Sequence, residues 1–200
     1  VKAWQVPEAA QAVRSMVGKA TAVMPIQNGV EAPSQVAAVL GSEHVVIGLV
    51  IVRSLIVGPG HIRHVLEVDP NFQLGEMDKR HSDRVERLRR ALENAGLSVK
   101  TPPDIHAAMW EKFLTFCVAS GMGAITRATS GVWRSLPETR QMAEAAAHEV
   151  MAVAQARGIA ISDQADKASM RIIDNFLEGH STSMAIDIVE GRPSELEAAT

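Results

Sequence analysis

Short apolar runs, each of strand length, recur through the first hundred residues of the chain. We expect strands in six of them, at residues 21–26, 44–53, 55–57, 62–68, 72–76 and 97–100. Apolar positions at helical spacing predict helices over residues 7–18, 31–40 and 82–95. Strand and helix patterns therefore alternate in this part of the chain.

Residues that turn the backbone or cap helices separate these elements. Turns are expected at Gln27-Asn28-Gly29 and at Gly58-Pro59-Gly60, because glycine and asparagine tolerate left-handed backbone conformations. Ser82 is expected to cap the helix that follows it, and Gly41 to end the helix before it.

The pattern changes at Pro102-Pro103, and only helices are predicted after it. They cover residues 104–124, 137–156, 162–177, 184–189 and 194–199, with Ser162 as the expected N-cap of the third. The fold class predicted is therefore α/β followed by all-α, with a boundary near residue 102.

Composition narrows the function classes. The one cysteine, Cys117, excludes an internal disulfide and fits a reducing cytoplasm. The net charge is −3, and the arginines of residues 84–90 alternate with acids as on a solvated helix face, so nucleic-acid binding is not expected. No apolar run reaches the roughly 20 residues of a membrane span, and no signal peptide is expected from these residues. The chain starts at Val1 and both ends look cut, so we expect it to be a piece of a longer protein.

Lys112 is the most unusual candidate for chemistry, because it interrupts an apolar helical stretch. Burying a lysine is costly unless it has a partner or a task, although its long stem also lets the amine reach the surface. Phe116 and Ser120 follow four and eight residues later and share the face of Lys112.

Other polar residues are ambiguous taken singly. Asn28 follows a predicted strand, where ligands bind in open α/β sheets, but turns are also rich in asparagine. Ser183 and Glu195 lie in the last helical stretch, where caps and surface residues are common. His61 and His64 point to opposite faces of a strand and no acidic cluster joins them, so a metal site is not expected.

Six motifs in one order along the chain resemble the ketopantoate reductase family. They are Val1-Lys2-Ala3-Trp4-Gln5-Val6, Pro25-Ile26-Gln27-Asn28-Gly29-Val30, Gly58-Pro59-Gly60-His61-Ile62 with Gly75-Glu76, Trp110-Glu111-Lys112-Phe113, Pro137-Glu138-Thr139-Arg140 with Glu149-Val150, and Thr182-Ser183-Met184 with Asp187-Ile188 and Gly191-Arg192-Pro193-Ser194-Glu195. Each motif is weak by itself, but their shared order is specific.

The resemblance implies a fold and an activity. Residues 1–102 would be the C-terminal portion of an NADP-binding Rossmann-type domain. Residues 103–200 would be a helical substrate and dimerisation domain of the 6-phosphogluconate dehydrogenase C-terminal type, cut short at its end. The family reduces 2-dehydropantoate to pantoate with NADPH, on the route to coenzyme A, so a small 2-keto acid substrate and a possible homodimer are implied.

The same resemblance implies roles for individual residues. Lys112 would be the general acid for the developing alkoxide, and Glu195 would hydrogen-bond this lysine or a substrate hydroxyl. The residues implied to contact substrate are Ser183, Asn28, Ser120 and Phe116. The residues implied to contact the cofactor are Lys2, Gln27 and Asn28.

Two departures from the family pattern qualify this expectation. Phe116 stands where the family usually has asparagine, which removes a polar contact and adds bulk. We therefore expect either a related 2-keto acid as substrate or weak activity on ketopantoate. No G-x-G-x-x-G motif occurs in these residues, so this stretch alone is expected to bind NADPH poorly and to be inactive. Two alternatives stay open, a β-hydroxyacid dehydrogenase relative and a non-catalytic dimerisation or binding module descended from a reductase.

Overall fold

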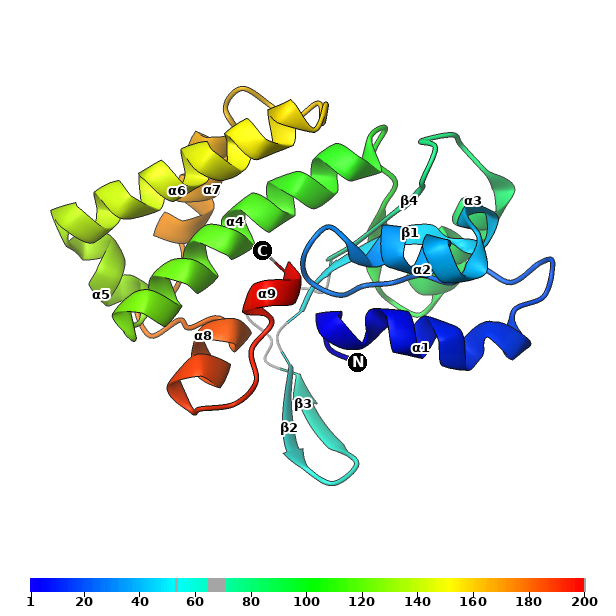
Figure 1. The fold of residues 1–200 in the computed structure, drawn as a ribbon, viewed down its shortest axis with the longest axis horizontal. Helices are drawn as coiled ribbons and strands as arrows, with labels where there is room; N and C mark the ends of the chain where they lie inside the picture. The colour runs from blue at the N-terminus through cyan, green and yellow to red at the C-terminus, as the bar shows by residue number, and fades with distance from the viewer. Residues whose placement is uncertain (53, 65–70, 200) are drawn as a thin grey trace. The chain divides into compact units, whose positions relative to one another are not determined.

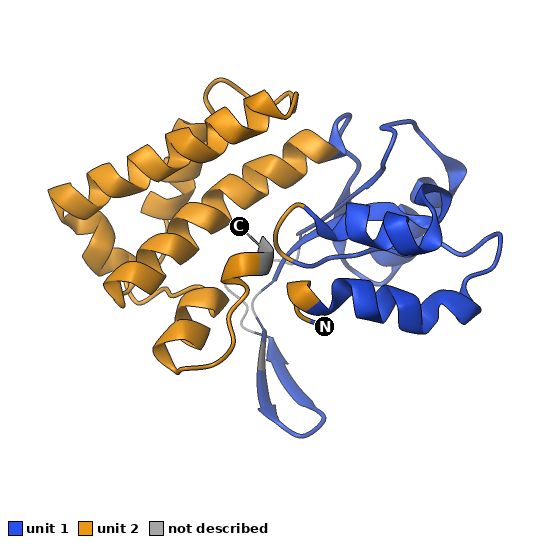
Figure 2. Cartoon of the chain, in the orientation of Figure 1, with its two compact units in different colours: residues 1, 5–27, 31–105 blue, residues 2–4, 28–30, 106–200 orange. Residues whose placement is uncertain are grey.

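The computed structural model describes residues 1–52, 54–64 and 71–199 of the chain. These residues divide into two compact units (Figure 2). Unit 1 contains residues 1, 5–27 and 31–105, and unit 2 contains residues 2–4, 28–30 and 106–200. Two short N-terminal segments therefore belong to the same unit as the C-terminal half.

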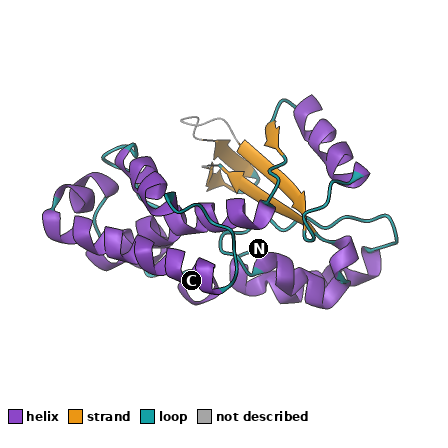
Figure 3. Ribbon diagram, turned by 90° about the horizontal axis from the view of Figure 1, so that it is seen from above, coloured by secondary structure: helices purple, strands orange, loops and turns teal. Residues whose placement is uncertain are grey.

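Unit 1 is built around a three-stranded sheet, drawn in orange in Figure 3. Its strands are β1 (Val46–Ile51), β4 (Asn71–Glu76) and β5 (Ser98–Lys100), in the order β1-β4-β5. β1 pairs with β4 antiparallel, and β4 pairs with β5 parallel. Strands β2 (Ser54–Gly58) and β3 (His61–His64) form a separate antiparallel hairpin (Figure 1).

One predicted strand of unit 1 was wrong. Residues 21–26 form only a single parallel bridge, between Val23 and Val45. Most of this run is only partly buried, so its apolar residues cover the edge of the core without joining the ladder. The part of the predicted strand at residues 62–68 that follows His64 lies outside the described residues. Arg53, at the end of the predicted strand at residues 44–53, lies outside them as well.

The predicted helices of unit 1 are present. They are α1 (Val6–Val13), which continues as a 3-10 turn over Arg14–Met16, α2 (Ala32–Leu40) and α3 (Asp83–Asn94). Both predicted end signals are confirmed. Gly41 has a φ of 95° directly after α2, and the Ser82 hydroxyl accepts a hydrogen bond of 3.2 Å from the Val85 N–H at the start of α3.

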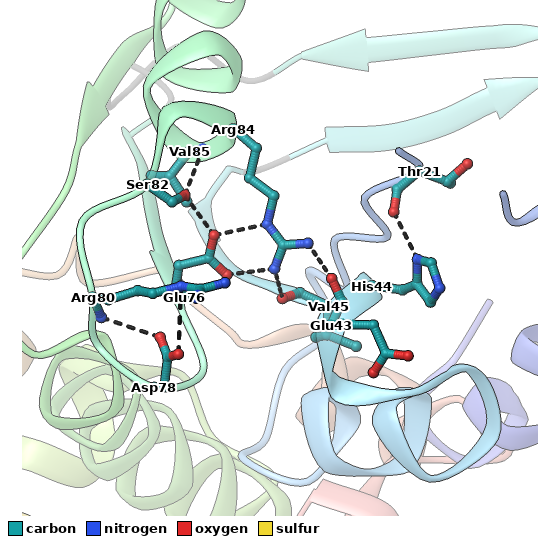
Figure 4. Close-up of polar contacts among 10 residues, drawn as sticks. All are labelled: Thr21, Glu43, His44, Val45, Glu76, Asp78, Arg80, Ser82, Arg84 and Val85. Atoms are coloured by element: carbon teal, nitrogen blue, oxygen red, sulfur yellow. Dashed lines mark hydrogen bonds and ion pairs between the residues drawn. The ribbon is translucent and has the colours of Figure 1, made fainter. Parts of the chain in front are cut away.

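A buried ion pair joins α3 to the sheet (Figure 4). The Glu76 side chain, at the end of β4, is 3% exposed and accepts hydrogen bonds from Arg84 and Ser82. The Arg84 guanidinium also donates to the carbonyls of Glu43 and Val45, on the approach to β1. Burial alone would raise the pKa of Glu76, but the bonds from Arg84 and Ser82 hold that pKa below its usual value.

Unit 2 contains the helices of the C-terminal half, which are α4 (Ile105–Thr126), α5 (Ser130–Ser135), α6 (Pro137–Ala156), α7 (Ala165–Asp174), α8 (Ser183–Val189) and α9 (Leu196–Ala199). Two details differ from the sequence predictions. Helix α5 was not predicted. Helix α7 begins at Ala165, with Gln164 as its N-cap, so Ser162 does not cap it.

The core of unit 2 forms where α4 meets the other helices. Leu114 and Val118 of α4 are almost fully buried together with Trp133 of α5 and Ile173 of α7. Helix α6 packs against both α5 and α7, and its buried residues, such as Ala147, are small. Among the helices of residues 1–52, 54–64 and 71–199, none is both long and apolar enough to cross a membrane.

Candidate functional site

Helix α4 carries three of the predicted site residues on one face. Lys112, Phe116 and Ser120 follow each other at four-residue intervals. Lys112 is partly buried, and within the described part of the chain its ammonium makes no hydrogen bond or ion pair. Burial lowers the pKa of Lys112, because removing the amine from water disfavours its charged form.

The other two side chains of this face differ in character. Ser120 is 0% exposed, and its hydroxyl has no hydrogen-bond partner among the described residues. Buried hydroxyls are normally satisfied, so Ser120 is a candidate for contact with a ligand or a water molecule. Phe116 is partly buried and packs against the core of unit 2.

Helix α8 approaches α4 closely at Gly123. A Cβ atom at Gly123 would lie 2.9 Å from the Cβ of Ala185, so this contact requires glycine. The contact brings the start of α8, with the exposed Ser183, to the C-terminal half of α4. Thr182 caps this helix, its hydroxyl accepting from the Ala185 N–H at 3.3 Å. The Ser183 side chain is therefore not needed as the cap.

The C-terminal end of α8 holds the first residues of the chain. Lys2 Nζ donates to Asp187 Oδ2 at 2.7 Å, and Arg192 Nε donates to Asp187 Oδ1 at 2.8 Å. The backbone N–H of Ala3 donates to Glu195 Oε1 at 2.9 Å. Glu195 is buried, and among the described residues no ion pair links it to Lys112.

The predicted turn at residues 27–29 is present, with Gly29 at a φ of 89°. Asn28 is partly buried in this bend and belongs to unit 2, and Val30 packs against the core of unit 2. Gln27 belongs to unit 1, and its buried side-chain oxygen has no hydrogen-bond partner among the described residues. The structure thus gives Gln27 an unpartnered acceptor.

The sequence predicts no role for Asp187 or Arg192, although both lie in the motifs that carry the resemblance. One signal could have identified Asp187. It lies three residues after the buried Met184 and therefore on the buried face of a short helix, where an acid requires a cationic partner. The partner Lys2 could not be found in the same way, because 185 positions separate the two residues.

The two histidines considered for metal binding lie on β3, where His61 is exposed and His64 is partly buried. Within the described ranges, no group of three or more His, Cys, Asp or Glu side chains could hold a metal ion. Cys117 is a free, partly buried thiol, and burial raises its pKa.

Comparison with known proteins adds information on origin. A family model described as "Ketopantoate reductase PanE/ApbA" matches residues 1–79, and one described as "Ketopantoate reductase PanE/ApbA C terminal" matches residues 104–200. A curated relative, 2-dehydropantoate 2-reductase of Nostoc sp., is 28% identical over 181 residues. The match covers 88% of this chain and 56% of the relative, so this chain spans little more than half the length of that protein.

Two solved structures share the fold across nearly the whole chain. 2-Dehydropantoate 2-reductase from Geobacter metallireducens has a TM-score of 0.89 and 27% identity, and covers 98% of this chain and 65% of its own. The complex of D-mandelate dehydrogenase with NADH also has a TM-score of 0.89, at 19% identity, and covers 100% of this chain and 67% of its own. At this lower identity the second likeness concerns the fold alone.

Proposed function

This chain belongs to the ketopantoate reductase family, and from that premise we propose that the protein reduces the C2 carbonyl of a 2-keto acid to a 2-hydroxy acid with NADPH. The observation that carries the proposal is the face of α4. It presents a partly buried ammonium and a buried hydroxyl, neither of which has a polar partner among the described residues. Two such groups on one face are expected where a polar ligand binds.

Lys112 is proposed as the proton donor. When a hydride reaches the carbonyl carbon, negative charge develops on the carbonyl oxygen, and the Lys112 ammonium both stabilises this charge and donates a proton to it. The lowered pKa of Lys112 favours the transfer, because a less basic amine releases its proton more readily near neutral pH. The carbonyl becomes an alcohol and the amine is left neutral until water reprotonates it.

Other polar residues of unit 2 are proposed to hold the substrate. The Ser120 hydroxyl shares the face of Lys112 and has no hydrogen-bond partner among the described residues. Ser183, at the exposed start of α8, and Asn28, in the bend of unit 2, offer further hydrogen bonds to a carboxylate or keto group. One carboxylate oxygen of Glu195 accepts from the Ala3 N–H. The second oxygen is proposed to bind a substrate hydroxyl, or to orient the amine of Lys112 when substrate is present.

Lys2, Gln27 and Asn28 are proposed to contact the cofactor. The buried, unpartnered oxygen of Gln27 fits a nicotinamide dinucleotide, because the sugar hydroxyls and carboxamide of such a cofactor are hydrogen-bond donors. The bound cofactor would supply the hydride. Lys2, whose side chain is 42% exposed, would supply a positive charge for a phosphate or carboxamide oxygen.

Phe116 points to the class of substrate. A phenyl ring cannot hydrogen-bond a hydroxyl, whereas an asparagine at this position could. Phe116 also packs against the core of unit 2, which keeps this part of the face apolar. We therefore propose a 2-keto acid whose side chain is apolar and branched or aromatic.

The test is NADPH oxidation by protein expressed from the complete gene, with a panel of 2-keto acids. The panel contains ketopantoate, 3,3-dimethyl-2-oxobutanoate, 2-oxoisovalerate and benzoylformate. We expect turnover of at least one apolar 2-keto acid with kcat/KM above that for ketopantoate. Oxidation of NADPH by none of them, with cofactor binding intact, would instead favour the non-catalytic binding module.

A further inference from the structure

Asp187 stands out because it is a buried acid at the centre of contacts that span the chain. Its side chain is 9% exposed and is shared by two cations, Lys2 at 2.7 Å and Arg192 at 2.8 Å. The Arg192 N–H also donates to the Asp187 carbonyl at 2.7 Å, which closes the turn after α8. One carboxylate thus connects the start of the chain to the loop that follows α8.

A second contact runs beside the first. Glu195 lies at the end of this loop and accepts from the N–H of Ala3, the neighbour of Lys2. We call the contacts of Lys2 and Ala3 with Asp187 and Glu195 the N-terminal tether. Two consecutive residues are therefore held by two buried acids, and residues 2–4 belong to unit 2 although residues 5–27 do not.

The charges of the tether support a fixed geometry. A buried carboxylate is costly unless charged hydrogen-bond donors surround it. Burial would raise the pKa of Asp187, but the hydrogen bonds from Lys2 and Arg192 lower it. Arg192 also pairs with Glu190, whose side chain is exposed to solvent. The buried carboxylate of Asp187 is the one that Lys2 and Arg192 share. Asp187 is therefore ionised at neutral pH, and its carboxylate binds the ammonium of Lys2 at 2.7 Å.

We infer that Asp187 is a positioning residue, which fixes the ammonium of Lys2 for binding of the dinucleotide cofactor. The inference rests on the proposed function, in which Lys2 contacts NADPH. Asp187 itself acts through Lys2 and touches neither cofactor nor reacting atoms. Its loss affects binding more than the chemical step, because Lys112 on α4 is unchanged.

The kinetic test uses protein expressed from the complete gene and compares Asp187→Asn with Asp163→Asn, an exposed aspartate of the same unit. We expect Asp187→Asn to raise the KM for NADPH about tenfold, the scale of one charge-assisted hydrogen bond, with kcat changed less than threefold. In a Lys2→Met background the same substitution should add less than twofold, because its target is gone. Asp163→Asn should change neither constant.

A merely structural role gives a different result. It predicts that the effects of Asp187→Asn and Lys2→Met multiply, and that kcat and KM worsen together as the protein loses stability. Thermal melting of each variant identifies this case. Independent, multiplying effects in folded proteins would overturn the inference.

A second readout needs no turnover. Acetylation of Lys2 by a limiting acyl ester, followed by mass spectrometry, reports how tightly its amine is held, with the exposed Lys19 as internal reference. We expect Asp187→Asn to increase labelling of Lys2 several-fold relative to Lys19, and Asp163→Asn to leave the ratio unchanged. An unchanged ratio in Asp187→Asn would overturn the inference. Increased labelling in a protein that reduces no 2-keto acid would support the tether and refute the reductase proposal.

Discussion

A lysine ammonium on an apolar helix face gives up its proton more easily than a lysine in water, because its charged form is poorly solvated. Lys112 is in this situation, and the pKa of its amine is lowered. Reduction requires the charged form, so kcat should fall as pH rises through this pKa. We expect this fall in kcat at a pH below the ordinary lysine pKa. In Lys112→Arg the fall should be absent, and the residual rate should not change with pH over the same range. A fall at or above the ordinary lysine pKa would contradict a desolvated proton donor.

Phe116 offers a second prediction, on specificity. Ketopantoate and 3,3-dimethyl-2-oxobutanoate differ only by a hydroxyl group, so their kcat/KM ratio isolates that contact. Phe116→Asn should raise the ratio in favour of ketopantoate by about tenfold or more, because an amide can bond the hydroxyl. Phe116→Leu, which restores no polar contact, is the control and should leave the ratio within about twofold. If the kcat/KM ratio of Phe116→Asn equals that of the wild type, the substrate side chain does not contact residue 116.

Single residues differ in how far sequence can identify them. Helical spacing predicts that Lys112, Phe116 and Ser120 share one face of a helix, and all three lie on α4. Their roles in the site came from the family resemblance and stay predictions. That the Ser120 hydroxyl lacks a partner could not be predicted, because this depends on every helix around α4. The ion pair of Lys2 and Asp187 could not be predicted for a related reason, because 185 positions separate these residues in the sequence.

The contact between α4 and α8 depends on the absence of a side chain at Gly123. Two glycines of α4 allow a matched comparison. A Cβ at Gly121 would meet nothing within 4 Å, whereas one at Gly123 would lie 2.9 Å from Ala185 Cβ. Gly121→Ala should stabilise the protein by up to about 1 kcal/mol through helix propensity. Gly123→Ala should be less stable than Gly121→Ala by about 1–3 kcal/mol, because it overpacks the contact.

Chemical denaturation measures both variants. Equal stability of Gly121→Ala and Gly123→Ala would show that α8 moves freely away from α4. If the KM for the 2-keto acid rises in Gly123→Ala but not in Gly121→Ala, the position of Ser183 depends on the contact between α4 and α8.

The ion pair of Glu76 and Arg84 makes a prediction at the junction of β4 and α3. Glu76→Gln leaves the Arg84 charge without its acid and should cost about 3 kcal/mol of unfolding free energy at neutral pH. The folded-state pKa of Glu76 is lowered, so this stabilisation is present above the unfolded-state pKa and lost as pH falls through the folded-state value. The gap between the two proteins should therefore narrow in acid. Glu93→Gln, at a more exposed pair with Arg89, should change little.

Elements with strong local signals were predicted well, and elements defined by their neighbours were not. Helix α6 was predicted with the limits observed, because Pro137 starts it and Gly158 follows its end. The strand at residues 21–26 failed, because strand pairing depends on a neighbour and only Val23 finds one. Helix α5 was missed because its six residues are too few to show periodicity.

At the scale of the whole molecule, the order α/β then all-α followed from the change of pattern at Pro102-Pro103. The unit boundary by contacts falls between Ile105 and His106, while the domain limit at residue 102 stays a prediction. The membership of residues 2–4 and 28–30 in unit 2 could not be predicted, because no local pattern distinguishes them from their neighbours. The site depends on these segments, since Lys2 and Asn28 lie in them.

The central claim is that Lys112 donates the proton in the reduction of a 2-keto acid. It is tested most directly by NADPH oxidation with the best 2-keto acid of the panel, using protein from the complete gene and comparing wild type with Lys112→Ala. The variant should lose at least about a hundredfold in kcat, the usual contribution of a positioned general acid, while NADPH binding and melting temperature stay the same. A Lys112→Ala protein that is folded, binds NADPH and turns over within a few-fold of the wild-type kcat would contradict the claim.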